Sequence, residues 1–229
     1  MIRLATYNEF CLPARRFDAP GGLFFESTGK TQPNDENRKR KKQGLFGRVK
    51  RRENMIRITV IDQEHRQDIR LPNEPFALTG RGVPSYVNER WSYEVRPFPP
   101  EQVGGMCFPD ENYDYDEMKD SVFLGAYEDE KCVGLAVLQP GFFRYLYLYD
   151  LKVCRAYRGQ KIGALLIDKA REIALRRGYR GLYTQGQDNN VGACLFYLHY
   201  GFHIGGLDTE VYRGTRQEGK ADILFYLDA

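Results

Sequence analysis

A glycine-bearing turn between a strand-like run and a helix-like run constrains this chain more than any other segment. Residues 145–153 are apolar and aromatic, as in a strand, and residues 162–177 repeat apolar side chains at helical spacing. The turn between them reads Arg158-Gly159-Gln160-Lys161-Ile162-Gly163-Ala164. A strand that leads directly into a helix places free backbone N–H groups at the helix N-terminus, where they bind phosphate. The sequence therefore predicts a strand–turn–helix unit with an anion-binding turn.

The glycine spacing of this turn excludes two common nucleotide loops. A dinucleotide loop reads G-x-G-x-x-G, which the spacing of Gly159 and Gly163 does not match. A P-loop continues from its last glycine with lysine and a hydroxyl residue, whereas Ala164 follows Gly163. The segment resembles a third loop, R-x-x-G-x-G/A, which binds the pyrophosphate of coenzyme A in the GNAT superfamily of N-acetyltransferases. Lys161 stands where that loop has its first glycine, and we expect it to keep a helical backbone and add a cation.

A second motif lies in the following helix-like run. Asn190 can cap a helix over residues 191–200, which Gly201 ends. The run contains the pattern Asn190-x-x-Ala193-x-x-Phe196-Tyr197-x-x-x-Gly201-Phe202. This pattern resembles the other coenzyme A segment of the GNAT proteins. The two motifs are separated by one helix and one strand, as in that superfamily.

The order of the remaining patterns predicts a strand meander that leads into a parallel βαβ unit. The expected strands cover residues 56–61, 91–95, 121–127, 131–138, 143–154, 181–185, 202–212 and 221–227, with a loop at 72–84. The resemblance implies the GNAT fold. We therefore expect an α+β (mixed α/β) protein with a central, mostly antiparallel sheet, a parallel βαβ acetyl-CoA unit and helices on both faces.

The resemblance extends over residues 55–229 and is most detailed with the streptothricin acetyltransferases. The shared residues include Pro72-Asn73-Glu74-Pro75-Phe76, Trp91, Gln187-Asp188-Asn189-Asn190 and Phe202-x-Ile204-Gly205. It implies an enzyme that transfers acetyl from acetyl-CoA to a primary amine of streptothricin, in its β-lysine moiety, and so confers antibiotic resistance. The alternative is a GNAT enzyme for another cationic amine, a polyamine or a protein lysine.

The same resemblance implies which residues hold acetyl-CoA. A splayed strand would pair with pantetheine, the turn would hold the pyrophosphate, and the second helix would contact the pantetheine arm. The residues at these positions are Leu151, Lys152, Val153, Arg158, Gly159, Gln160, Lys161, Ile162, Gly163, Ala164, Asn190 and Ala193. Asn190 can serve both as helix cap and as pantetheine ligand.

Two residues are the candidates for proton transfer. Tyr197 is the candidate general acid for the departing thiolate, and its alternative role is that of a core tyrosine. Asp150 lies in the strand before the turn and is the candidate base, because an amine of pKa about 10.4 must lose a proton before it attacks. Asp150 can instead bind the substrate cation or have a structural role. Tyr149, beside it, is an expected substrate contact.

An acid-rich segment precedes the strand meander. It reads Asp110-Glu111-x-x-Asp114-x-Asp116-Glu117-x-x-Asp120, with Lys119 as its one basic residue. Such a segment suits a cationic substrate, and Asp114, Asp116 and Glu117 are the expected contacts. The alternative is a solvated loop.

Charge divides the chain at Met55. Of the 34 basic and 31 acidic residues, 13 and 6 lie in residues 1–54, which gives this segment a net charge of +7 and residues 55–229 a net charge of −4. Residues 1–54 read as a basic, disordered extension, and Met55 as a possible true start of translation. The alternative is that the basic clusters of residues 1–54 contact nucleic acid, but we expect no nucleic-acid partner. Residues 55–229 form the expected acetyltransferase domain.

The composition predicts a reduced, cytoplasmic protein, and we expect a monomer or a homodimer. The 5 cysteines are scattered without C-x-x-C spacing, and the 3 histidines form no zinc signature, so we expect no metal. The longest stretch without a charged residue or a histidine, residues 133–143, is shorter than the roughly 20 residues that span a membrane. We expect no membrane association and no secretion signal.

Overall fold

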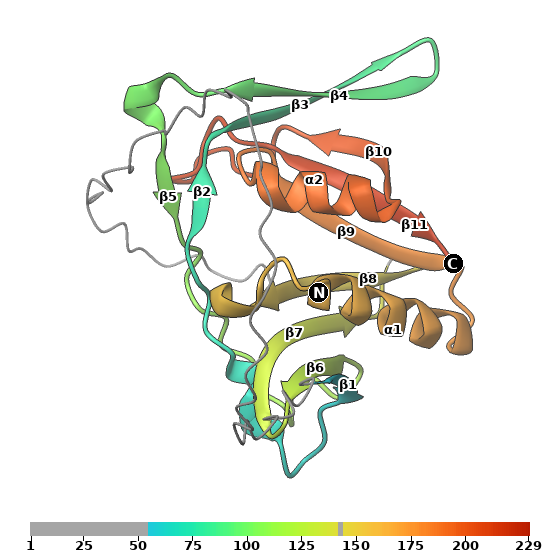
Figure 1. Cartoon of the computed structure of the whole chain (residues 1–229). Coiled ribbons are helices and arrows are strands. Elements are labelled where there is room, and N and C mark those ends of the chain that lie inside the picture. The colour runs from blue at the N-terminus through green and yellow to red at the C-terminus, as the bar shows by residue number, and fades with distance from the viewer. Residues whose placement is uncertain (1–54, 142–143) are drawn as a thin grey trace, which may run out of the picture. The chain divides into compact units, whose positions relative to one another are not determined.

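The computed structural model describes residues 55–141 and 144–229 (Figure 1). The basic extension over residues 1–54, its expected disorder and the expected domain boundary at Met55 lie outside or at the edge of the described residues. Within these ranges no helix is long and apolar enough to cross a membrane. The four cysteines of the described ranges are free thiols, and no cluster of potential metal ligands occurs there.

A seven-stranded sheet in the order β1-β6-β7-β8-β9-β11-β10 forms the centre of the described part (Figure 1). Its strands are β1 (Ile56–Val60), β6 (Val122–Glu128), β7 (Lys131–Gln139), β8 (Tyr145–Val153), β9 (Gly181–Gln187), β10 (His203–Asp208) and β11 (Asp222–Asp228). Only β8 and β9 pair in parallel; every other neighbouring pair is antiparallel. This confirms the predicted α+β class with a mostly antiparallel sheet.

Two helices frame the parallel pair. Helix α1 (Ile162–Arg176) joins β8 to β9, and α2 (Val191–Tyr200) follows β9. The apolar stripe of α1 is buried, and Gly178, with a φ of 79°, follows its C-terminus in the left-handed conformation that glycine favours. The Asn190 side chain caps α2 by accepting the N–H of Ala193, and Gly201 ends α2 with a φ of 118°. Both predicted helices are therefore present, and α2 has its predicted cap and stop.

The two faces of the sheet have separate hydrophobic clusters. Both α-helices pack on one face, where Leu148 of β8, Leu166 of α1 and Cys194 of α2 belong to one buried cluster. On the other face, the short 3-10 helix η1 (Arg66–Arg70) and the segment 113–118 cover β6 and β7. The part of this second face over β8, β9 and β11 carries tyrosines that are only partly buried.

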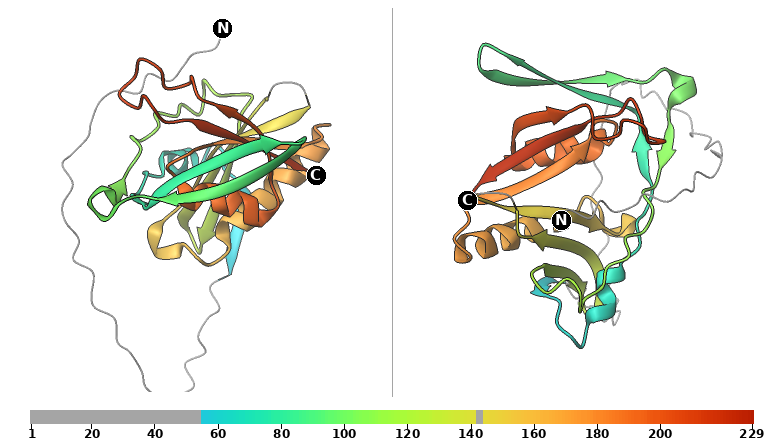
Figure 2. Two further views of the ribbon diagram at one scale, coloured as in Figure 1. Left: turned by 90° about the horizontal axis from the view of Figure 1, so that it is seen from above. Right: turned by 180° about the vertical axis from the view of Figure 1, so that it is seen from behind.

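Two smaller pairs of strands lie outside the seven-stranded sheet. Strand β2 (Phe76–Leu78) pairs with β5 (Gly104–Met106), which follows the 3-10 helix η2 (Pro100–Gln102), and β3 (Gly80–Val87) pairs with β4 (Arg90–Pro97). The β3–β4 pair forms a long ribbon that contacts α2 through β3 (Figure 2).

The expected loop over residues 72–84 is therefore wrong in part. This segment contains β2 and the first half of β3. Its prolines and glycines predict a loop, but Pro84 lies in a two-stranded ribbon, where a strand has one unpaired edge and tolerates the missing N–H. Pairing with residues far along the chain outweighs the local signal.

Strands β8 and β9 diverge after a short paired stretch. Their parallel pairing covers only Tyr145–Tyr147 against Gly181–Tyr183, although β8 continues to Val153. Beyond it, the hydroxyl of Thr184 donates a 2.8 Å hydrogen bond to the Leu148 carbonyl. The β9-facing edge of β8 is thus without a strand partner from residue 148 onward.

A β-bulge in β8 changes which side chains face each side of the sheet. Leu148 pairs with Leu138 and Asp150 pairs with Val137, so Tyr149 is an extra residue in β8. Leu148 and Leu138 face the helices, whereas Val137 belongs to the cluster on the opposite face. The bulge therefore turns Asp150 away from the helix side, where strict alternation from Leu148 would have placed it.

Candidate active site

The turn before α1 forms an anion-binding site from backbone groups. The amide of Leu165 is the first in α1 to bond within the helix, at 3.1 Å to the Lys161 carbonyl, so the amides of residues 162–164 have no partner in the helix. No acidic side chain lies in the first turn of α1. Gly159 has a φ of 77°, and no atom lies within 4 Å of the position that a Cβ would take there. These features fit a diphosphate group.

The expected helical backbone at Lys161 is wrong. Lys161 has a φ of 63° and a ψ of 10°, which is the left-handed conformation, and its side chain makes no cap hydrogen bond. The turn therefore needs left-handed backbone at the position where the motif has glycine. A lysine pays about 1 kcal/mol or more for this conformation because its Cβ approaches the carbonyl oxygen.

Gly163 has a packing role in addition to its place in the anion-binding turn. A Cβ at this residue would lie 3.0 Å from the Phe196 ring of α2. The glycine therefore lets α1 and α2 approach closely. The two coenzyme motifs are in direct contact at this point.

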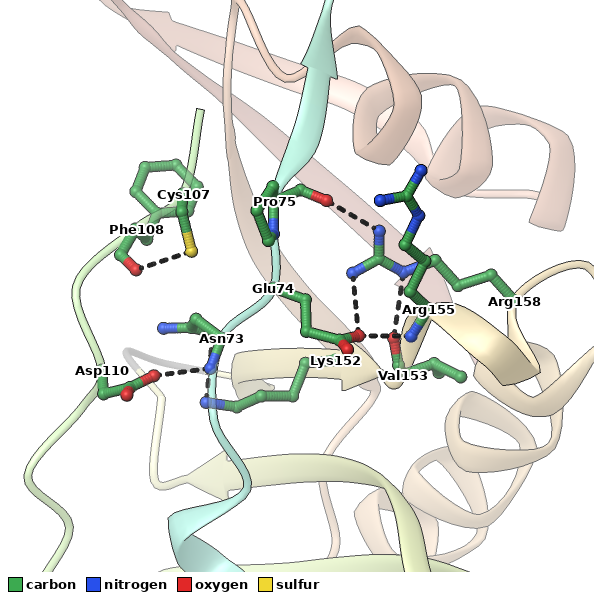
Figure 3. A network of polar contacts seen from close by, with 10 residues as sticks. All are labelled: Asn73, Glu74, Pro75, Cys107, Phe108, Asp110, Lys152, Val153, Arg155 and Arg158. Atoms are coloured by element: carbon green, nitrogen blue, oxygen red, sulfur yellow. Dashed lines mark hydrogen bonds and ion pairs between the residues drawn. The ribbon is translucent and has the colours of Figure 1, made fainter. Parts of the chain in front are cut away.

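Arg158 contacts protein groups beside the turn (Figure 3). Its guanidinium donates to the carbonyls of Val153 and Pro75, both at 3.0 Å, and lies 3.7 Å from the carboxylate of Glu74. The same carboxylate accepts the N–H of Arg155. Arg158, which the sequence predicts as a phosphate contact, thus fastens the segment before β2 to the end of β8.

Asp150 is held by two donors on the face opposite the α-helices. Its Oδ2 accepts a 2.8 Å hydrogen bond from the Tyr113 hydroxyl and lies 2.9 Å from the Lys152 ammonium. Lys152 also donates to the Asn73 amide oxygen at 3.2 Å (Figure 3). The Oδ1 atom of Asp150 receives no hydrogen bond from the described part of the chain. One carboxylate oxygen is therefore fixed, and the other remains able to accept a proton or a cation.

This network gives the Lys152 side chain a role in addition to the expected coenzyme contact of its strand. The sequence predicts Lys152 as a coenzyme contact, but its side chain is only 10% exposed and its ammonium lies between Asp150 and Asn73. The ammonium also lies 5.6 Å from the centre of the Tyr113 ring. The Lys152 side chain therefore positions Asp150, while the Lys152 backbone stays on the open edge of β8.

The acid-rich segment divides into two parts in space. Asp114 accepts the N–H groups of Asp116 and Glu117, at 2.9 and 3.1 Å, and Asp116 lies 3.6 Å from Arg66 of η1. These three predicted substrate contacts are exposed, and none of their contacts reaches Asp150. They form a capped surface turn.

Glu111 is the acidic residue that the sequence reasoning missed. Its pKa is raised, first by burial and then by the charge of Asp150. The residues around it are anchored, since Asp110 accepts the N–H of Asn73 at 2.5 Å and Tyr113 donates to Asp150. Glu111 is thus held near the candidate base, as a second carboxylate from a distant part of the chain. Only its half-buried environment distinguishes it from its acidic neighbours, and no sequence pattern shows that.

Tyr197 lies at the other side of the divergence between β8 and β9. It is 7% exposed and packs against Phe202 and Phe225, with ring centres 5.3 and 5.4 Å away. Burial raises the pKa of Tyr197 and the charge of Asp150 raises it further, while a hydrogen bond with Thr184 opposes the shift. The phenol therefore stays protonated at neutral pH, as a general acid must. Its packing shows that it is also a core residue.

These features define a class of enzyme. An anion-binding turn, two diverging parallel strands, a tyrosine and a carboxylate are together the features that fit an acyl-coenzyme A substrate and an amine. A family model described as the acetyltransferase (GNAT) family matches residues 88–202, and the chain belongs to this family. It is an acetyl-CoA-dependent N-acetyltransferase, with acetyl-CoA as co-substrate.

The chain is similar to curated proteins from two bacteria. It is 29% identical over 160 residues to streptothricin acetyltransferase A of Bacillus subtilis (strain 168), an alignment that covers 70% of this chain and 92% of the relative. It is 26% identical over 159 residues to a streptothricin acetyltransferase of Escherichia coli, covering 69% of this chain and 79% of that protein.

Solved structures share the fold. A protein of Bacillus anthracis str. Ames, assigned as a streptothricin acetyltransferase and solved with acetyl coenzyme A, is 26% identical with a TM-score of 0.68, and the alignment covers 76% of this chain and 100% of that chain. The crystal structure of a nourseothricin acetyltransferase has a TM-score of 0.62 at 24% identity, covering 76% of this chain and 98% of that chain. The latter likeness shows the fold alone.

Proposed function

We propose that this enzyme acetylates a primary amine of streptothricin, in its β-lysine moiety, and thereby confers resistance to the antibiotic. The observation that carries the proposal is the fixed carboxylate of Asp150 on the face opposite the α-helices, beside the point where β8 and β9 diverge. A protonated amine is the group that such a carboxylate binds. The similarity to streptothricin acetyltransferases over most of their length supports this choice of amine.

Two sets of backbone groups and the start of α2 would hold the co-substrate, which supplies an acetyl thioester. The unpaired edge of β8 over residues 151–153 offers peptide groups to the pantetheine arm, and an N–H near Leu151 would polarise the thioester carbonyl. The amides of residues 160–164 would hold the pyrophosphate, assisted by the positive end of α1. Asn190 and Ala193 lie at the start of α2, where they already form its cap.

The proton transfers fall to three side chains. Asp150 binds the ammonium of the acceptor through Oδ1 and takes its proton, directly or through water, and Glu111 supplies a second carboxylate nearby. The neutral nitrogen then forms a bond with the acetyl carbon while the carbon–sulfur bond breaks. Tyr197 gives its proton to the departing sulfur, the second proton that leaves the acylated nitrogen restores the Tyr197 phenol, and Asp150 passes its own proton to solvent. Each charge that develops during these reaction steps thus has a protein group that stabilises or neutralises it.

The test compares three amines under the same conditions. Thiol release from acetyl-CoA is measured with streptothricin, spermidine and a lysine peptide, on chains that begin at Met1 and at Met55. We expect kcat/KM for streptothricin to exceed that for the other two by at least about tenfold, with equal rates for the two chains. A preference for spermidine or the peptide would replace streptothricin with a polyamine or a protein lysine as the substrate.

A further inference from the structure

A row of tyrosines crosses the sheet face opposite the α-helices. Tyr147 of β8 contacts Tyr183 of β9, with ring centres 5.1 Å apart, and Tyr183 contacts Tyr226 of β11 at the same distance. Tyr147 also contacts Tyr149 at 5.6 Å, and Tyr149 contacts Tyr113, the donor to Asp150, at 6.2 Å. Aromatic surface therefore extends from the catalytic carboxylate across three strands.

A set of hydrogen-bond acceptors lies next to this aromatic surface. Gln187 of β9 is the register partner of Asp222 of β11, and Asp222 is the register partner of Asp208 of β10. Opposite residues in antiparallel pairs have their side chains on the same face. Gln187 and Asp222 are each an even number of residues from Tyr183 and Tyr226, so the three acceptors share the face of the tyrosines.

The buried groups of this set lack the donors that would satisfy them. Gln187 is only 5% exposed, its Nε2 donates to Gln217 at 2.8 Å, and its Oε1 has no hydrogen-bond partner. Asp222 is 7% exposed and accepts one hydrogen bond, from the Tyr212 hydroxyl at 2.7 Å. Within the described ranges no basic side chain forms an ion pair with Asp222 or Asp208. A buried acceptor without a donor costs free energy until a ligand supplies one.

The charge of Asp222 reaches the tyrosine row. Burial raises the pKa of Asp222, and the neighbouring carboxylate of Asp208 raises it further. Asp222 in turn contributes to the raised pKa values of Tyr147 and Tyr183, the latter at about 12. Two neighbouring carboxylates therefore lie on the face of the tyrosine row, as a site for an extended cation requires.

We propose that Gln187, Asp208 and Asp222 form a second cation subsite, which binds a distal ammonium or guanidinium group of the acceptor. The inference deepens the proposed function and rests on it, since the reacting amine would lie at Asp150. Strands β8 and β11 are two strand spacings apart, so the two carboxylates are separated by about 10 Å or more. The tyrosines would contact the chain between the two cationic groups. The acceptor is thus an elongated polycation.

Two amines of equal length test this subsite. 1,7-Diaminoheptane spans about 10 Å between its nitrogens, which matches two strand spacings, and heptylamine lacks the second charge. We expect Asp222→Asn and Asp208→Asn each to lower kcat/KM for the diamine about tenfold, mainly through KM, and to change that for heptylamine less than about twofold. Tyr212→Phe, which removes a hydrogen bond from Asp222 and keeps the charge, is the matched control and stays near the wild type.

A measurement of binding alone, without acetyl transfer, distinguishes a failure of this inference from a failure of the proposed function. Calorimetry measures 1,7-diaminoheptane binding to the wild type and both variants with coenzyme A present. Weaker diamine binding by the variants supports the subsite even if streptothricin is not acetylated. Equal losses of kcat/KM for 1,7-diaminoheptane and heptylamine, or no loss of kcat/KM for the diamine, would overturn the proposed subsite. Asp208 is half-buried, so Asp208→Asn decides the outcome if Asp222→Asn fails to fold.

Discussion

Lys161 departs from the sequence of the motif, but the backbone of the turn keeps the conformation that favours glycine. It adopts the left-handed backbone that the motif normally assigns to glycine. We expect Lys161→Gly to raise the free energy of unfolding by up to about 1 kcal/mol, because glycine adopts this conformation without strain but also gains freedom in the unfolded chain. Lys161→Ala, which keeps the Cβ, is the control and should give no gain. Chemical denaturation of the three proteins checks this, and equal gains in both variants would contradict it.

Tyr197 combines a core position with the proposed acid role. Tyr197→Phe keeps the aromatic packing against Phe202 and Phe225 and removes only the hydroxyl. We expect kcat at saturating substrates to fall by about 10²-fold or more, since the departing thiolate loses its proton donor. Tyr200→Phe, another tyrosine of α2, is the matched control and should keep its kcat. An unchanged kcat in Tyr197→Phe would leave this residue with packing alone.

Glu111 should affect both the stability of the folded protein and the activity of the enzyme. Its folded pKa lies above the ordinary value of 4.5, so the folded protein binds this proton more tightly than the unfolded chain does. Stability then falls as the pH rises from 4.5 through the folded pKa, and the cost persists above it. Glu111→Gln should therefore be more stable than the wild type near pH 8, with no gain near about pH 4, and it should have a lower kcat/KM.

Thermal unfolding at both pH values and initial rates check the Glu111 prediction. Glu117→Gln is the matched control, since Glu117 is exposed in the same acid-rich segment. A Glu111→Gln variant with wild-type rates would exclude a role in proton transfer. A stability gain that is as large near pH 4 as near pH 8 would contradict the account of its burial.

At the scale of elements, the bulge in β8 determines which face carries the chemistry. The extra residue Tyr149 brings Asp150 to the side of Tyr113 and Lys152. The strand itself could be predicted, because its apolar and aromatic pattern is local. The bulge could not, because it depends on pairing with β7. The network around Asp150 could not be predicted for the same reason, since Tyr113, which donates to Asp150, and Asn73, which accepts from Lys152, come from distant segments.

The helices and their caps are the elements that the sequence predicts best. Asn190 caps α2 and Gly201 ends it, and both signals lie within the helix's own neighbourhood. The segment over residues 72–84 shows the opposite case. Its strands exist only because β4 and β5 pair with them, and its local composition favours a loop.

At the scale of the whole molecule, we expect the acid-rich turn to act only through its electrostatic field. Asp116 and Glu117 are exposed and lie in a capped turn beside η1, away from the contacts of Asp150. We expect neutralising both, as Asn and Gln, to raise KM for a polycationic acceptor by less than about threefold at low salt, with no difference above about 0.5 M salt. Initial rates over a salt series check this. A large rise in KM that persists at high salt would show direct contact instead.

The proposed coenzyme site lies on segments that the sequence alone marks, whereas the proposed acceptor site does not. The turn at Arg158 and the helix after Asn190 are continuous segments, so a local motif in each is enough to predict a function. The acceptor face combines side chains from β8, β9, β10 and β11 through strand register. Its chemistry, carboxylates and tyrosines that face one side of the sheet, appears only once the strands are paired.

The most direct test of the central claim is the mass of streptothricin after incubation with this enzyme and acetyl-CoA. The account predicts the addition of one acetyl group, located by fragmentation on an amine of the β-lysine moiety, and almost no product with Asp150→Asn. Unmodified streptothricin in a reaction where the same enzyme acetylates another amine would contradict it.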